Sequence, residues 1–154
     1  MARLLLAVCM SLAASTTVLA AQVGPPVLDP KRVKEGQAIY RQNCSSCHGA
    51  KSEGASDWRE PNEQGDLPPP PHNQEGHTWR HSDADLYEMI AKGWRDPFNE
   101  TDLLTMPPFG EVLAPEEIEA VVTYLKSLWT EEQRRYQLQE SLKEPFPAAT
   151  KHNP

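Results

Sequence analysis

The chain has 154 residues, a net charge of −7 and 38% hydrophobic residues, which fits a single domain with a small core. The acidic balance argues against a nucleic-acid partner, because binding to a phosphate backbone depends on clustered lysine and arginine. Proline is frequent, with 15 residues in the chain, about twice the usual frequency of ~5%. We therefore expect long ordered loops beside few regular elements.

The N-terminal 20 residues have the pattern of an export signal. Arg3 supplies a positive charge, residues 4–19 carry no charge, and residues 18–20 form a small-residue cleavage site. We expect cleavage before Ala21, which removes Cys9 from the mature protein. The alternative is an uncleaved membrane anchor, but hydroxyl residues interrupt the apolar run, and a spanning helix needs ~20 mostly apolar residues. In either case we expect the mature domain outside the cytoplasm.

The first predicted helix runs from residue 30 to about residue 44. Asp29 is a good N-cap, and Pro30 at the first helical position lacks only a donor that would be unpaired anyway. Residues up to Tyr40 then recur at helical spacing. The last turn of this helix therefore delivers Cys44, directly before the sequence Ser-Ser-Cys-His.

Cys44 and Cys47 are the only cysteines after the predicted signal, and His48 follows at once. This count excludes a structural zinc site with four protein ligands and a scaffold held by several disulfides. Two thiols at i and i+3 share one face of a helical turn and can bond to both vinyl groups on one edge of a porphyrin. His48 can reach the iron from the same side, and Gly49 lets the chain turn away from the ring. The C-x-x-C-H pattern thus predicts one covalently attached haem c per chain.

The second axial position of such an iron is filled by methionine, by histidine or by no residue. Met106 precedes Pro107 and Pro108, which forbid a helix and favour an extended conformation before them. We predict that Met106 is the second ligand, displayed on a stiff loop. Met89 lies in a helical pattern, and we assign it to core packing.

A polar, proline-rich loop contains the three rival histidines, which are His72, His77 and His81. We interpret them as solvated loop residues. Among them, His77 is the best alternative to Met106 as the second iron ligand. The four prolines at 68–71 favour polyproline II structure. We expect the carbonyl of Pro69 to accept a hydrogen bond from His48 Nδ1, which orients the ring and raises its basicity.

Trp79 and Arg80 are further candidates, because both can bond haem propionates. Core packing for Trp79 and a solvated charge for Arg80 are the simpler interpretations of these residues.

The remaining predicted elements are helical. A capping box at Ser82 starts one helix, which ends at Gly93. Pro115 starts another, with three glutamates near its positive N-terminus, although Ala114 is a poor cap. A further helical piece begins near Thr130, and we expect the tail from residue 145 to be mobile. No alternating strand pattern appears, so the fold is predicted to be mostly α.

Together these stretches resemble the mono-haem class I cytochromes c, over about residues 31–129. The matching segments are residues 36–40, 44–49, 106–109 and 121–129. The resemblance implies a small fold of a few helices wrapped around one covalently bound haem, with long proline-rich loops. It also implies thioether bonds at Cys44 and Cys47, and it makes His48 and Met106 the axial ligands.

The resemblance suggests a division of the chain. Residues 1–20 form the signal peptide, 21–28 a linker, 29–130 the cytochrome c domain and 131–154 a C-terminal extension. It further implies that the first helix crosses the last one of the domain at Gly36 and Tyr40, against Tyr124 or its neighbours.

The predicted function is one-electron transfer by an exported, periplasmic protein that is not itself an enzyme, since two axial ligands leave no position for a substrate. Unidentified redox proteins would donate and accept the electron. We expect contact with the membrane only if the N-terminal segment is not cleaved, in which case it would anchor the domain at the outer face of the inner membrane. Three alternatives remain open: a haem-bearing subunit of a larger dehydrogenase or oxidase, a five-coordinate haem sensor or enzyme, and a thiol oxidoreductase that uses Cys44 and Cys47.

Overall fold

The computed structural model describes residues 24–63, 65–97 and 103–143. The predicted signal peptide, Cys9 and the tail from residue 145 lie outside these ranges. The elements in chain order are α1 Pro30–Asn43, α2 Ser45–His48, η1 Thr78–Arg80, α3 Asp83–Lys92, α4 Pro115–Ser127 and α5 Glu131–Lys143. The mostly α prediction is confirmed, and in the described ranges one isolated β-bridge joins Trp94 to Met106. No helix in these ranges is long and apolar enough to cross a bilayer.

The first helix begins and ends where its sequence predicts. Asp29 Oδ1 accepts a hydrogen bond from Lys31 N at 2.9 Å, which satisfies one of the free donors of the first turn. At the other end, Cys44 N donates to Tyr40 O at 2.8 Å. The helix therefore carries the chain directly into the cysteine motif.

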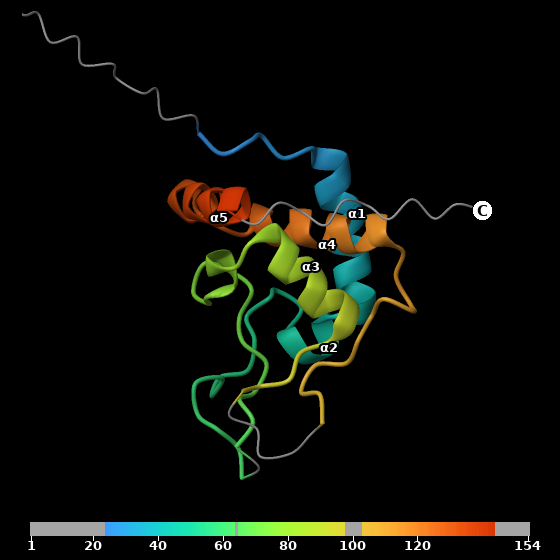
Figure 1. The fold of residues 1–154 in the computed structure, drawn as a ribbon, viewed down its shortest axis with the longest axis vertical. Helices are drawn as coiled ribbons and strands as arrows, with labels where there is room; N and C mark the ends of the chain where they lie inside the picture. The colour runs from blue at the N-terminus through green and yellow to red at the C-terminus, as the bar shows by residue number, and fades with distance from the viewer. Residues whose placement is uncertain (1–23, 64, 98–102, 144–154) are drawn as a thin grey trace, which may run out of the picture.

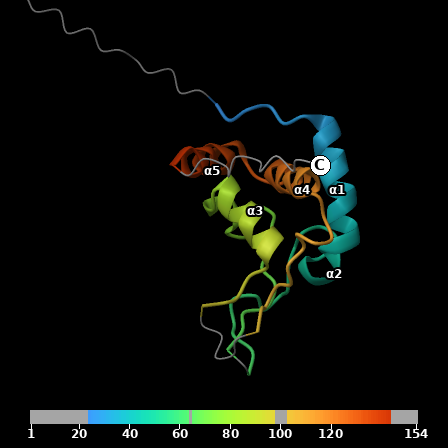
Figure 2. The same cartoon turned by 45° about the vertical axis from the view of Figure 1, so that its right-hand side comes forward.

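Helices α1 and α4 cross closely, as both ribbon views show (Figure 1, Figure 2). At Gly36 an added Cβ would lie 1.9 Å from Ala120 O, so only glycine allows this approach. One turn later the Tyr40 ring packs on Tyr124 with centroids 5.2 Å apart. The predicted crossing at Gly36 and Tyr40 is confirmed. Around it lies the buried apolar core of Tyr40, Leu86, Ile90, Leu113, Ile118, Val121, Val122, Tyr124, Leu125 and Trp129.

The caps of α3 and α4 differ. Ser82 Oγ accepts from Asp85 N at 3.0 Å and Asp85 Oδ2 accepts from Ser82 N at 3.2 Å, which completes the predicted capping box. Ala114 has no side-chain acceptor for α4, but Glu117 Oε2 accepts from Ala114 N at 2.8 Å. Half of a capping box thus starts a helix that the sequence leaves under-specified.

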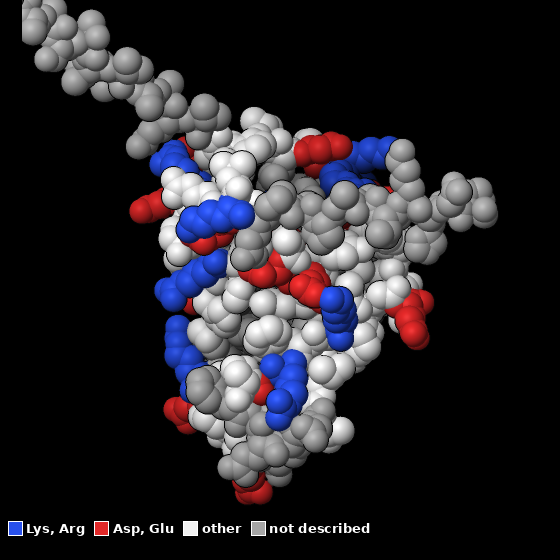
Figure 3. Space-filling model, viewed as in Figure 1, with Lys and Arg blue, Asp and Glu red and all other residues white. Residues whose placement is uncertain are grey.

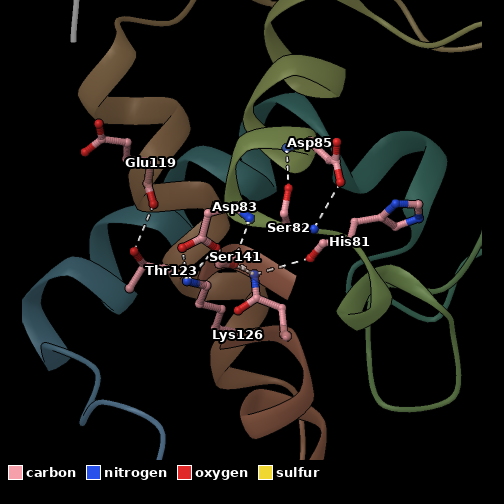
Figure 4. A network of polar contacts seen from close by, with 9 residues as sticks. His81, Ser82, Asp83, Asp85, Glu119, Thr123, Lys126 and Ser141 are labelled. Atoms are coloured by element: carbon pink, nitrogen blue, oxygen red, sulfur yellow. Dashed lines mark hydrogen bonds and ion pairs between the residues drawn. The ribbon is translucent and has the colours of Figure 1, made fainter. Parts of the chain in front are cut away.

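The last helix, α5, packs on η1 and α3 through a polar network (Figure 4). Gln137 is only 2% exposed, and its Nε2 donates to Asp83 Oδ1 at 2.7 Å and to Ser141 Oγ at 2.9 Å. Lys126 of α4 pairs with the Asp83 carboxylate at 2.6 Å. Residues 131–143 therefore belong to the same folded body as the helices before them.

Candidate functional site

Cys44 lies between α1 and α2, and Cys47 lies within α2. Cys44 is the C-cap of α1, and its carbonyl accepts from Cys47 N at 3.2 Å and from His48 N at 3.0 Å. Both thiols are free, with Cys44 half-buried and Cys47 exposed. One tight turn thus presents two uncommitted sulfur atoms next to a histidine, as the C-x-x-C-H pattern predicts.

The protonation of Cys44 bears on the thiol oxidoreductase alternative. Burial, together with the nearby Cys47, raises the pKa of the Cys44 thiol to about 11. A redox-active C-x-x-C pair needs a thiolate, and its nucleophilic cysteine has a lowered pKa. The raised pKa of Cys44 therefore argues against a redox-active thiol pair.

His48 is buried, with 8% of its surface exposed, and its ring is held by one hydrogen bond. Nδ1–H donates to Pro70 O at 3.0 Å. Burial lowers the pKa of His48, and the bond to Pro70 opposes this effect in part. Since the proton sits on Nδ1, the lone pair of Nε2 is free, which is the form of imidazole that binds a metal.

The acceptor for His48 is Pro70, so our prediction of Pro69 is wrong by one residue. Pro69 O instead accepts from Ala55 N at 2.9 Å. A polyproline II segment has three residues per turn, so successive carbonyls point in different directions. Only one of them can face His48, and the sequence does not fix which.

Backbone contacts hold the chain after the motif against the polyproline segment. Gly54 N donates to His48 O at 2.8 Å, and Gly54 has φ +67°. An added Cβ at Gly54 would lie 2.4 Å from Pro71 N, so the approach requires glycine. Tyr40 Oη donates to Gly49 O at 3.1 Å, and burial raises its pKa to about 12, which keeps the phenol protonated.

The loop histidines are half-buried and pack against other rings, so our interpretation of them as solvated residues is wrong. The ring of His72 lies 4.0 Å from that of His48, and burial holds the pKa of His72 well below its usual value. His77 stacks on Trp58 at 5.7 Å and lies edge-on to His81 at 5.6 Å. Trp129 Nε1 donates to His72 O and Gln133 Nε2 to Gln74 O, both at 2.9 Å, and these long-range bonds hold the loop inward. No local pattern reveals them.

Met106 is half-buried against the apolar core. It forms an antiparallel bridge with Trp94, in which each backbone N donates to the other residue's O at 3.0 Å. The expected extended conformation is therefore confirmed. Met89 does not join the core cluster: it is half-buried and lines a shallow depression on α3 beside Glu88, so our assignment of Met89 to core packing is wrong.

The loop that carries Met106 also closes the end of α3. Phe109 N donates to Ile90 O and Gly110 N donates to Ala91 O, both at 2.9 Å. These bonds satisfy carbonyls that a helix end leaves free. Gly93 has φ +79°, and the loop passes so close that an added Cβ there would lie 2.6 Å from Met106 O. The position of Met106 is thus set by long-range backbone contacts.

Trp79 and Arg80 have partners in the protein. Trp79 Nε1 donates to Gly76 O at 3.0 Å, and its ring meets that of Tyr136 edge-on at 5.4 Å. The Arg80 guanidinium lies 5.0 Å from the centre of the Trp79 ring. These contacts support the packing interpretation of Trp79, and a bond of either residue to a propionate stays a prediction.

The donor atoms fit a haem c. Two free thiols suit two thioether bonds, the free Nε2 of His48 suits the iron, and the thioether of Met106 would suit a second, soft ligand.

Comparison with known proteins agrees with this chemistry. Residues 33–129 match the family model described as cytochrome c. The Cbb3-type cytochrome c oxidase subunit FixP of Rhizobium meliloti (strain 1021) is 30% identical over 107 residues, 69% of this chain and 33% of that protein. FixP of Sinorhizobium medicae (strain WSM419) is 29% identical over the same length. The chain therefore spans about a third of the length of these relatives.

A solved structure supports the fold. Cytochrome CL of Methylophaga aminisulfidivorans MPT has a TM-score of 0.52 at 22% identity, covering 78% of this chain and 69% of that one. At this identity the likeness concerns the fold alone.

Proposed function

The chain belongs to the cytochrome c family, and from this premise we propose that it carries single electrons on one haem c held by Cys44, Cys47, His48 and Met106. The observation that carries the proposal is the bond from His48 Nδ1 to Pro70 O at 3.0 Å, directly after two free thiols. It fixes the tautomer and the direction of the imidazole before any ligand binds.

When bound, the haem supplies an iron that alternates between Fe(III) and Fe(II). The residues of the chain set how this iron behaves. Met106 offers a thioether, which favours Fe(II) and raises the reduction potential relative to two histidines. The apolar core beside Met106 acts in the same direction, because it disfavours the additional charge of Fe(III). With His48 and Met106 both bound, no coordination position is left for a substrate.

The proposed function also bears on where the protein works and on which proteins exchange electrons with it. The export pattern of residues 1–20 supports a mature domain in the periplasm, either released or held at the membrane by that segment. On the face seen in Figure 3 acidic and basic side chains are interspersed. This face does not indicate one sign of partner charge, so the donor and the acceptor must be identified by experiment.

A second candidate function is that of a haem-bearing subunit in a larger oxidase. It is favoured by the similarity to FixP, whose name describes an oxidase subunit. Purification of the tagged chain from both the membrane fraction and the soluble fraction of native cells distinguishes the two. Stoichiometric recovery of other oxidase subunits supports the subunit role, and recovery of the chain alone in the soluble fraction supports the free carrier.

The visible spectrum tests the proposed function. The protein is produced with the haem-maturation machinery and measured oxidised, reduced, and reduced with carbon monoxide. We expect sharp low-spin bands, haem that survives acid–acetone extraction, and no shift with carbon monoxide. A ready shift with carbon monoxide would favour the five-coordinate sensor or enzyme instead.

A further inference from the structure

We propose that Asp96 is a positioning residue that joins the loop of Met106 to the polyproline segment that orients His48. The proposal rests on the proposed function, because it takes Met106 as the second axial ligand. Figures 1 and 2 show the two loop regions, which follow α2 and α3, lying side by side at the same end of the molecule.

The side chain of Asp96 faces the polyproline segment. Asp96 is only 5% exposed, and its Oδ2 accepts from Leu67 N at 3.2 Å, across 29 positions of sequence. Leu67 directly precedes the four prolines at 68–71, which have no backbone N–H. Leu67 N is therefore the last donor before the run, and the bond to Asp96 holds that end of the segment.

The other end of the same segment is held independently. His72 N, the first donor after the prolines, donates to Ser52 O at 2.9 Å. Pro70, whose carbonyl accepts from His48, lies between the two fixed ends. Between these ends Pro69 O also accepts from Ala55 N at 2.9 Å, so the bond at Leu67 is one of three that set the direction of the Pro70 carbonyl and, through it, that of the His48 ring.

The backbone of Asp96 faces the methionine loop. Asp96 N donates to Thr105 Oγ1 at 3.2 Å, and the same hydroxyl donates to Trp94 O at 3.0 Å. Thr105 directly precedes Met106, and Met106 is bridged to Trp94. One residue thus holds the loops that contribute to both axial ligands, one through its carboxylate and the other through its amide.

A purely structural role for Asp96 predicts a different outcome from a positioning role. Loss of a buried, charge-assisted hydrogen bond lowers stability wherever it occurs. Only a positioning role also lets the methionine loop shift against the segment that holds His48 in molecules that remain folded, so that Met106 leaves the iron more often. The rate at which carbon monoxide binds to the reduced protein reports this release, because the ligand needs an open sixth position.

The test compares Asp96→Ala, Asp96→Asn and Thr105→Val in the haem-loaded full-length protein. Asp57→Ala, an exposed aspartate of the same loop region, is the matched control. We expect Asp96→Ala to show a carbon monoxide shift within a time in which the unchanged protein and Asp57→Ala show none, and to show about tenfold faster hydrogen exchange at Leu67 N–H. Asp96→Asn keeps an acceptor oxygen, so it should show no carbon monoxide shift in that time and stay within about threefold of the unchanged protein in hydrogen exchange. Thr105→Val should show the same kind of carbon monoxide response as Asp96→Ala. If Asp96→Ala does not fold, the response of Thr105→Val tests the proposal.

Met106→Ala separates the two proposals. If it leaves the spectrum and the carbon monoxide rate unchanged, the proposed ligation is wrong and the role of Asp96 is overturned with it. If Met106→Ala opens the iron while Asp96→Ala and Thr105→Val behave like Asp57→Ala, the proposed ligation stands and the Asp96 proposal alone is overturned.

Discussion

The two sides of the proposed iron site are built in different ways. On the His48 side, one helical turn places the ligand beside both cysteines, and burial with a single bond to Pro70 fixes its ring. On the Met106 side, a loop is held to α3 and to Trp94 by backbone bonds between distant segments. The backbone of the first proposed ligand is thus placed by local sequence, whereas the direction of its ring and the position of the second proposed ligand depend on tertiary structure. When the fold is perturbed, we expect the proposed bond of Met106 to the iron to be lost before that of His48.

Removal of His48 should have the largest effect. His48→Ala removes the proposed ligand that directly follows the cysteines, so we expect almost no stable low-spin haem protein. The absorption spectrum and the yield of covalent haem measure this. His77→Ala is the control and should keep a low-spin spectrum, because we assign His77 to packing on Trp58.

Removal of Met106 should have a large effect on potential and a small one on attachment. Met106→Ala should retain covalent haem and lower the reduction potential by on the order of 0.1 V or more, since axial ligands set the potential over a wide range. A redox titration measures the change. Met89→Ala should leave the potential unchanged, and an equal fall in both variants would remove the distinction between the two methionines.

A change at the helix crossing should affect stability without affecting the iron. Gly36→Ala brings a methyl group against Ala120 O, so we expect a loss of about 1–3 kcal/mol in the free energy of unfolding. Denaturant unfolding measures the loss. The low-spin spectrum of the folded fraction should persist, and its disappearance would mean that the α1–α4 contact also positions a ligand.

The smallest effect concerns Tyr40 at high pH. Its pKa is raised from 10.0 to about 12 in the folded protein, so the folded state keeps a proton that the unfolded state loses. Stability from this group is complete below pH 10 and falls between pH 10 and 12. Tyr40→Phe should lose about 1 kcal/mol at neutral pH and flatten this decline. An equally steep decline in the variant would assign the pH dependence to other groups.

The sequence was sufficient where neighbouring residues determine the structure. The N-cap at Asp29, the capping box at Ser82 and the turn from Cys44 to His48 involve contacts within a few positions, and each is found as predicted. The crossing at Gly36 was available only from the family resemblance, because nothing local shows which helix passes there.

The sequence was insufficient where distant segments meet. His72 is half-buried because its loop folds against His48, and the choice of Pro70 over Pro69 depends on the rotation of the polyproline segment. The contacts of α5 through Gln137 link residues more than 50 positions apart, which no helical pattern reveals. A glutamine among polar neighbours carried no signal that it would be buried.

The most direct test of the central claim is the carbon monoxide response of the reduced wild-type protein measured beside that of Met106→Ala. We predict no response in the wild type and a prompt spectral shift in the variant, with covalent haem in both. A prompt shift in the wild type, or no shift in the variant, would contradict the assignment of His48 and Met106 as the two axial ligands.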